Sequence, residues 1–338
     1  MATSNSNDAQ IAIVAETVQG VTPATPVFLV VKATGESLKA NPETEDDTEF
    51  GKQGRSSSPM DIGGLTVNGA INFNLRKSSW FDAVLSGVFA SPWGTCPADG
   101  SALVETNGLF VGKTLQTFTI EKRIADPVTP GSWLYQRFTG CSFSNLQLTI
   151  TPNQRITGSV SVVGGVPSLD TAIITGATYT PAEANPAFRA PDVLTLTLSG
   201  VAVGTYCWTQ ATLTFDSGNT GLPCIGTSGN REVSLGLMKA SLSGTIYLRD
   251  QTILQTMYDN GSLLDAIVDL QDTALTPNHY WFQLFDVKPT AAESVISGPN
   301  VQMTIPLTVE ATPTLVCPTA APTWESSVYA GKATLTPL

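Results

Sequence analysis

The stretch LTVNGAINFNLRKSSWFDAVLSGVF, from Leu65 to Phe89, changes its hydrophobic period partway along. Its first part alternates apolar and polar residues, which predicts a strand with one buried face. Its second part carries a helix-period apolar stripe, formed by Trp80, Phe81, Val84, Leu85 and Val88. Ser78 or Ser79 supplies an N-cap. We therefore expect a strand, a tight junction and a short helix whose apolar face packs on the sheet of that strand.

A second stretch, MKASLSGTIYLRDQTILQTMYDNG from Met238 to Gly261, has the same order of features. Each copy passes through a glycine and a Leu-Arg step before a helix stripe, which consists here of Ile253, Leu254 and Met257. An aromatic strand, a turn and a final strand entered through Pro-Asn follow in both halves of the chain. The repeated order predicts an internal duplication. The alternative is two unrelated strand-helix units.

Composition and turn spacing favour strands over long helices. Only 13% of the 338 residues are charged, and turn dipeptides recur at short intervals,. No run of 18 apolar residues occurs, and the first ten residues lack the pattern of a secretion signal, so we expect no membrane segment,. We predict a mainly β fold with a minor helical part, divided into an arm (1–26), a first domain (27–176), a linker (177–191), a second domain (192–311) and an extended tail (312–338).

Catalytic and metal-binding patterns are missing from the sequence. The five cysteines are far apart without a CxxC pair, and the chain has one histidine, His279, so a zinc site is poorly supported,. His279 lies in a strand pattern, where a structural or surface role is more common than catalysis. There is no GxSxG, phosphate loop or HExxH motif,. We expect no enzyme, no cofactor and no metal, and reduced thiols.

Charge points away from nucleic-acid binding. The formal net charge is −11, whereas surfaces that grip DNA need clustered Lys and Arg,. The acids concentrate in a turn-rich stretch, Asn41 to Gly64, that we predict to be a long loop. Loops of this length are commonly functional or disordered, so the stretch is either a solvated loop or a specific contact. Its acidic residues are Glu43, Glu45, Asp46, Asp47 and Glu49.

Several segments together resemble the major tail tube proteins of long-tailed, non-contractile bacteriophages (siphophages). The resemblance covers most of Ala15 to Ala311, and no single motif in it is diagnostic. It is carried by AETVQGVTPATP (15–26), GESLKANPETEDDTEF (35–50), GGLTVNGAINFNL (63–75), KASLSGTIYLRDQTILQTMYDNG (239–261), HYWFQLFDVK (279–288) and GPNVQMTIPLTVEA (298–311).

The resemblance implies two tandem tube domains, each a β-sandwich or half-barrel with a short flanking helix. Their inner sheets would join neighbouring chains into a continuous barrel. Single-domain members of the family generally form hexameric rings, so two domains per chain imply a pseudo-hexameric trimer; a single tube domain with an unrelated outer domain would imply six chains. The acidic loop would contact the adjacent ring.

The same resemblance implies a location and a set of partners. The protein would belong to the virion tail, assemble in the host bacterial cytoplasm, and contact tape measure, terminator and distal tail proteins. DNA would pass through the lumen without specific binding, and an acidic lumen would repel it. The alternative function is a β-rich capsid decoration or adhesive virion protein, which would not stack on itself.

Overall fold

The computed structural model describes residues 5–46, 60–94, 108–129, 131–198, 207–225, 229–247, 264–272, 279–292, 302–311 and 328–332. These residues form a mainly β structure with one α-helix, α1 (Ser79–Phe89), and two short 3-10 helices, η1 (Ser6–Asp8) and η2 (Ala190–Asp192). The strands of the first half are β1 (Ala9–Ala15), β2 (Val27–Val31), β3 (Ala33–Glu36), β4 (Lys39–Asp46), β5 (Met60–Asn74), β6 (Gly108–Phe110), β7 (Phe118–Ala125), β8 (Trp133–Ile150), β9 (Thr157–Val163), β10 (Val166–Asp170) and β11 (Thr178–Thr180). Those of the second half are β12 (Val193–Leu198), β13 (Trp208–Asp216), β14 (Thr220–Pro223), β15 (Asn230–Ser234), β16 (Lys239–Tyr247), β17 (Leu264–Gln271), β18 (His279–Ala292), β19 (Thr304–Ala311) and β20 (Val328–Lys332).

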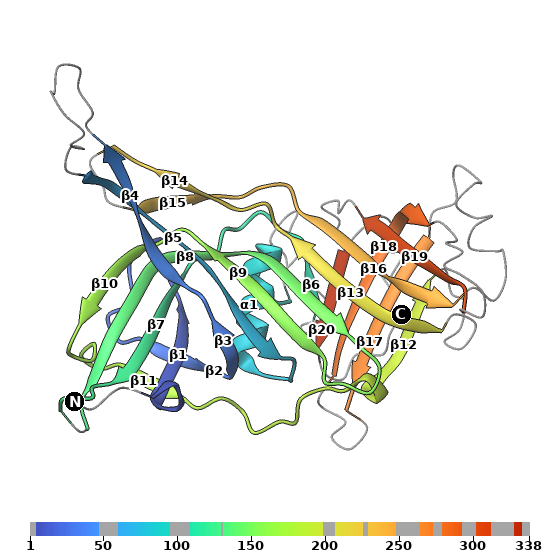
Figure 1. The fold of residues 1–338 in the computed structure, drawn as a ribbon, viewed down its shortest axis with the longest axis horizontal. Coiled ribbons are helices and arrows are strands. Elements are labelled where there is room, and N and C mark those ends of the chain that lie inside the picture. The colour runs from blue at the N-terminus through green and yellow to red at the C-terminus, as the bar shows by residue number, and fades with distance from the viewer. Residues whose placement is uncertain are drawn as a thin grey trace, which may run out of the picture.

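Hydrogen bonding connects nearly all strands into one large sheet, which bends into three parts (Figure 1). The central sheet has the order β4, β5, β9, β8, β13, β16, β19, β18, with β3 continuing the β4 edge. A first flank sheet has the order β11, β2, β1, β7, β8, β10, in which β11 runs parallel to β2. A second has the order β12, β17, β18, β20, β6. The long strands β8 and β18 each pass from a flank sheet into the central sheet.

One hydrophobic core fills the space between these sheets, and residues from both halves of the chain contribute to it. The helix α1 lies inside this core. The ring of Trp80 contacts that of Phe73 on β5, with centroids 5.0 Å apart, while Phe81 contacts Tyr280 on β18 at 5.3 Å. Figure 1 shows α1 between the two lobes of the molecule. The helix therefore ties the two halves together through apolar contacts.

Part of the expected N-terminal arm is a strand of the sheet. Ala9–Ala15 forms β1, which pairs with β2 on one side and β7 on the other. The consecutive residues Ala12 and Ile13 are both buried because β1 lies between two strands, and one of these, β7, is distant in sequence. Because composition within a short window does not reveal distant pairing, the polar and proline-rich surroundings of this segment suggested an arm.

Two other expectations also need correction. The stretch Asn41 to Gly64 is not a simple loop, because Asn41–Asp46 and Met60–Gly64 pair as the two arms of a β4–β5 ribbon. Within the expected extended tail, Val328–Lys332 forms β20, which fills the space between β18 and β6. The expected linker is ordered and packs along the first half, where Phe188 is buried and exchanges backbone hydrogen bonds with Leu75 and Ile156.

Candidate assembly surface

The two halves of the chain repeat one strand-pairing order. In the first half, β1 pairs with β7, β7 with β8, β8 with β9, β9 with β5, and β5 with β3 and β4. In the second half, β12 pairs with β17, β17 with β18, β18 with β19, β19 with β16, and β16 with β13. All these pairings are antiparallel, and corresponding strands occur in the same order along the chain. In this order β8 of the first half corresponds to β18 of the second. β10, which pairs with β8, likewise corresponds to β20, which pairs with β18.

A seam within the chain joins these halves in the central sheet. The end of β8 pairs with β9 on one edge and with β13 on the other, with Ile150 opposite Ala211 and Asn145 opposite Asp216. Backbone hydrogen bonds therefore continue from the first half into the second without an interruption. The seam uses two strand edges that would otherwise be open.

Each end of the central sheet presents an edge of the same kind. On one side, no described strand pairs with the outer edge of β3 and β4. On the other side, Lys288–Ala292 of β18 pairs with β19, and no described strand covers its second edge. In the repeated pairing order, β18 corresponds to β8, and β3 with β4 corresponds to β13. The two open edges are thus the counterparts of the edges that meet in the seam.

One face of the central sheet carries two rows of polar side chains, all neutral except one. Along each strand, buried apolar residues face the core and alternate with partly exposed residues on the opposite face,. Cross-strand neighbours form one row, Asn72, Ser159, Gln147, Thr214, Ser241 and Glu310. They form a second row, Asn74, Thr157, Thr149, Thr212, Ser243 and Thr308. These rows cross the seam and contain a single charged residue, at the β19 end.

Sequence reasoning did not identify these two rows. A signal for them exists, because Ser and Thr alternate with apolar residues in SVSVV (159–163), TLTF (212–215) and SLSG (241–244),. Such alternation is common to half-exposed strands of all kinds. Without the register between distant strands, the residues do not assemble into a continuous surface.

Two ribbons extend from corresponding places in the central sheet (Figure 1). The β4–β5 ribbon includes Glu43 and Glu45, whose side chains are exposed, and the backbone of Asp46. Asp47 and Glu49 lie outside the described residues. The β14–β15 ribbon connects β13 to β16, as the first ribbon connects β4 to β5. The two ribbons are therefore equivalent in the repeated strand order but differ in charge.

The predicted helix residues lie as follows. Trp80, Phe81, Val84 and Leu85 are buried on α1, whereas Ile253, Leu254 and Met257 lie outside the described residues. Ser78 occupies the N-cap position, but its side chain makes no capping hydrogen bond.

A distant carboxylate caps the helix instead, because Glu183 accepts hydrogen bonds from the backbone amide of Ser79 at 2.8 Å and from its hydroxyl at 2.5 Å. Burial raises the pKa of Glu183, but these hydrogen bonds and the charge of Lys77 outweigh burial, so the pKa lies below its ordinary value.

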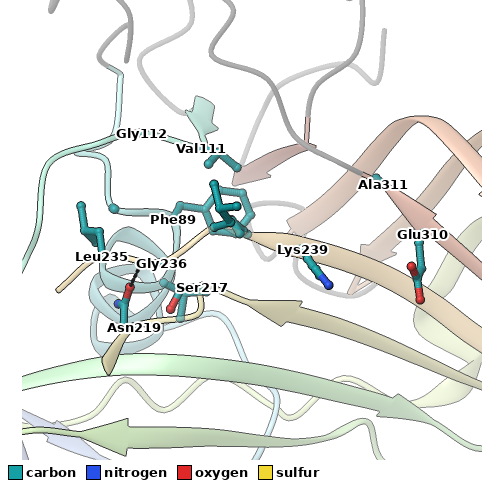
Figure 2. A pocket seen from close by; sticks show the side chains of 14 residues that line it. Phe89, Val111, Gly112, Ser217, Asn219, Leu235, Gly236, Lys239, Glu310 and Ala311 are labelled. Atoms are coloured by element: carbon teal, nitrogen blue, oxygen red, sulfur yellow. Dashed lines mark hydrogen bonds between the residues drawn. The ribbon is translucent and has the colours of Figure 1, made fainter. Parts of the chain in front are cut away.

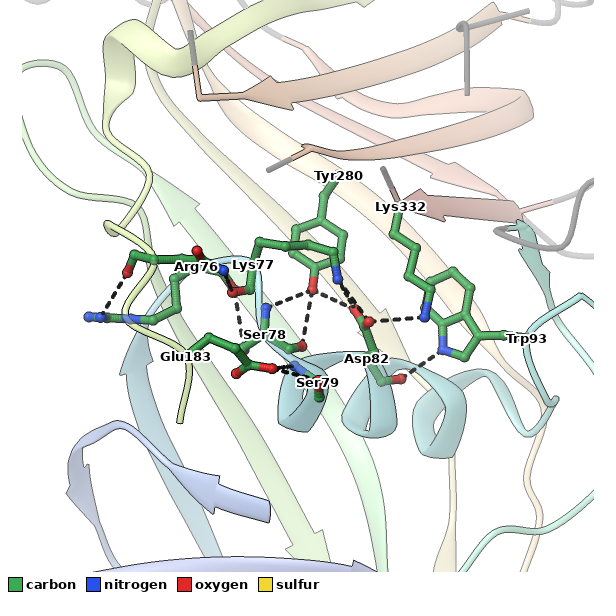
Figure 3. A network of polar contacts seen from close by, with 10 residues as sticks. Arg76, Lys77, Ser78, Ser79, Asp82, Trp93, Glu183, Tyr280 and Lys332 are labelled. Atoms are coloured by element: carbon green, nitrogen blue, oxygen red, sulfur yellow. Dashed lines mark hydrogen bonds and ion pairs between the residues drawn. The ribbon is translucent and has the colours of Figure 1, made fainter. Parts of the chain in front are cut away.

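A polar network links α1 to the second half (Figure 3). The carboxylate of Asp82 accepts hydrogen bonds from Lys77 Nζ at 2.8 Å, from Lys332 Nζ on β20 at 2.9 Å, and from the Tyr280 hydroxyl on β18 at 2.6 Å. The ammonium group of Lys332 also lies over the ring of Trp93, 4.1 Å from its centroid. Burial, followed by the charge and hydrogen bond of Asp82, raises the pKa of Tyr280 well above its ordinary value. The network fixes both β18 and β20 to the helix.

A pocket of about 450 Å³ lies beside this region, at the start of β16 and the end of β19 (Figure 2). Phe89 and Val111 line it from the first half, and Leu237, Lys239 and Glu310 line it from the second. Leu237, at the edge of this pocket, is 89% exposed. The pocket combines an apolar floor with charged residues at its margin.

Within the described part of the chain, His279 and Cys141 are buried and contact other residues of the fold. His279 Nε2 and Asp269 Oδ1 form a buried hydrogen bond, 2.5 Å long, between the neighbouring strands β18 and β17. Cys141 is buried, and burial together with the nearby charge of Glu16 raises the pKa of its thiol. No group of three or more His, Cys, Asp or Glu residues is arranged to hold a metal ion in the described segments. None of the helices described is long and apolar enough to cross a membrane.

Comparison with known proteins gives one result that covers most of the chain. A sequence model of a family described as "Phage tail tube protein" matches residues 6–312. A search of curated proteins finds no match.

Proposed function

The chain belongs to the phage tail tube protein family, and we propose that it polymerises into stacked rings whose channel carries DNA during ejection. Members of this family are structural, non-enzymatic components of the virion tail, and membership implies self-assembly. The main support for this proposal comes from the central sheet. It combines a continuous polar face with two open edges of the kind that already pair within the chain.

A ring closes if the pairing seen at the internal seam is repeated between neighbouring copies of the chain. In this proposal, the Lys288–Ala292 edge of β18 pairs with the β3 and β4 edge of the next copy, as β8 pairs with β13 within one chain. This contact is heterologous, and a heterologous contact repeated about an axis closes into a ring. Closure covers the unpaired backbone groups of both edges, which would otherwise favour uncontrolled association.

The repeated strand order supports three chains in each ring. We propose that residues 27–176 and 192–311 contain duplicated tube domains, to which β1 and β20 also contribute strands. Two such domains per chain make a trimer equivalent to a hexamer of single-domain subunits. From the sequence resemblance we also propose that the tail is that of a long-tailed, non-contractile phage.

The two polar rows are proposed to line the channel. Hydroxyl and amide groups keep water at the wall and offer DNA no clustered cations, so the phosphate backbone has no counterions to exchange for protein contacts. A charge-poor wall differs from the acidic lumen that net charge alone suggested. DNA passage in this arrangement depends on the absence of attraction more than on repulsion.

The β4–β5 ribbon is proposed to carry contacts between copies. Its acidic residues, including Glu43 and Glu45, would meet basic or hydrogen-bonding groups of another subunit, with the segment beyond Asp46 reaching the adjacent ring. Tape measure, terminator and distal tail proteins are the further partners that a tube of this kind requires at its lumen and ends.

Electron microscopy of the purified full chain, combined with native mass spectrometry, tests this function. We expect hollow rings or tubes and an assembly that contains three chains per layer. A complementary variant pair, with one cysteine at Thr290 and another at Lys39, reports whether the two open edges meet between copies. A protein that stays a monodisperse monomer across concentration, salt and template conditions would contradict the proposal.

A further inference from the structure

We propose that the base of the acidic β4–β5 ribbon seats in the pocket beside Leu237 and Lys239 of a neighbouring copy in the same ring. This inference rests on the proposed ring and names the surface that receives the ribbon. The occupant is a second copy of this chain. The ribbon base comprises Pro42–Asp46 and Met60–Leu65, which are described residues.

The β14–β15 ribbon supplies the template, because it already seats on the other half of its own chain. At its base, Ser217 Oγ donates to the carbonyl of Ser144 at 2.9 Å, and Asn219 Nδ2 donates to Ser142 Oγ at 2.9 Å. Farther along, the amide of Gly165 donates to the carbonyl of Asn230 at 3.3 Å. The ribbon therefore crosses β8 and the end of β9 in the first half.

Packing in this template is close. Val233 of β15 is buried, and a Cβ on Gly164 would lie 2.6 Å from its Cγ2 atom. Gly164 also has φ +83°, a left-handed conformation that favours glycine,. The first half thus has a seat shaped for an apolar side chain on the returning arm of a ribbon.

The repeated strand order locates the equivalent seat on the second half. The places crossed by the β14–β15 ribbon correspond to Lys288 on β18, the end of β19 at Ala311, and the start of β16 at Lys239. Lys239 and Ala311 line the open pocket, so the predicted seat coincides with it. Figure 2 shows Lys239 and Ala311 at the pocket, where the described residues leave a volume of about 450 Å³.

The β4–β5 ribbon carries an exposed apolar side chain and exposed acidic side chains, which complement the apolar residues and lysines at this seat. Ile62, on its returning arm, is 68% exposed, so its side chain is available for an apolar contact of the kind that Val233 makes in the template. Glu43 and Glu45 are exposed acids. In the register of the sheet, Lys239 lies opposite Asp216 and Lys288 lies opposite Glu310, but neither lysine forms an ion pair with any described residue, so both ammonium groups are available to the ribbon. Apolar contact and opposite charges therefore favour the same placement, and complementary charge mainly fixes partner and orientation.

Charge reversal in the full chain tests this placement. Glu43→Lys with Glu45→Lys should raise the concentration at which half of the chains are in rings by about tenfold at low salt. Lys239→Glu with Lys288→Glu should have a similar effect, and combining all four changes should restore rings. Ile62→Asp should also weaken rings, whereas Val128→Asp, at a site that is 84% exposed in the β7–β8 turn, is the control and should not.

Native mass spectrometry and electron microscopy separate the outcomes. Loss of rings in each reversed pair and recovery in the combination support the inference. If the variants form normal three-chain rings that fail to stack, the ribbon acts between rings, and this inference is overturned while the proposed function stands. If the unaltered chain forms no rings, both are overturned.

Discussion

Asp82 provides a quantitative test of how the two halves of the chain are held together. Its carboxylate receives Lys77 from the approach to α1, Tyr280 from β18 and Lys332 from β20, and its side chain is 14% exposed. The Asp82→Asn variant keeps the shape but removes the charge. It also places an amide group where two ammonium groups need an acceptor.

The expected loss in the free energy of unfolding follows from the three groups that donate hydrogen bonds to Asp82. A hydrogen bond to a charged group contributes about 1.5–3 kcal/mol, but contributions within one network are not additive. Removing one partner from a buried ion pair costs about 3–5 kcal/mol. Because this site retains some contact with water, we expect the free energy of unfolding to fall by about 3 kcal/mol, near the lower end of that range.

Urea unfolding at pH 7, followed by both tryptophan fluorescence and far-UV circular dichroism, measures this loss. We expect one transition with both probes, because α1, β18 and β20 share the carboxylate and one core,. Asp170→Asn is the matched control, since Asp170 is 46% exposed and its partner Arg137 keeps Glu121, so the loss should stay below about 1 kcal/mol,. Equal losses in the two variants, or separate transitions for the two halves, would refute this account of the network.

Three further predictions concern other sites. Glu183→Gln should lower the free energy of unfolding at pH 7 by about 0.5–1 kcal/mol, because it weakens the cap at Ser79. The folded-state pKa of Glu183 is lowered, so this contribution is present above the unfolded-state pKa and is lost as the pH falls through the folded-state value. Urea unfolding should therefore show a larger difference between Glu183→Gln and the unaltered chain at pH 7 than at pH 3,. Cys141 should react with a thiol reagent only on unfolding, because burial disfavours its thiolate, and mass spectrometry of the labelled peptide in native and denaturing buffer measures this,. Thr212→Lys should leave assembly intact but cause tubes to retain DNA at low salt, which co-sedimentation detects; no difference from Thr212→Ser would show that this row does not face the channel.

Local sequence patterns predict the elements whose partners are close in the chain. The change of period between Leu65 and Phe89 predicts β5 and α1, and the structure has both, with the helix running from Ser79 to Phe89. Alternation and turn composition also predict the mainly β character. These features depend on side-chain period and capping, which a short window contains.

The features that short windows miss depend on pairing between distant residues. Glu183 caps a helix that begins 104 residues earlier, and β20 enters a sheet between strands from both halves. β1 lies between two strands, of which β7 is remote in sequence. The polar rows and the seam likewise depend on register, which alternation alone does not specify. The proposed assembly surface is therefore harder to predict from sequence than the strands that form it.

The seam between β8 and β13 has a consequence for how tubes nucleate. In the proposed ring of three chains, every second junction between tube domains forms as the chain folds, and only the remaining junctions require an encounter between molecules. The concentration of rings should then rise with about the third power of free chain concentration, compared with the sixth power for a ring of separate domains. Covalent connection thus makes nucleation less sensitive to dilution, because one partner of each internal junction is always present at high effective concentration.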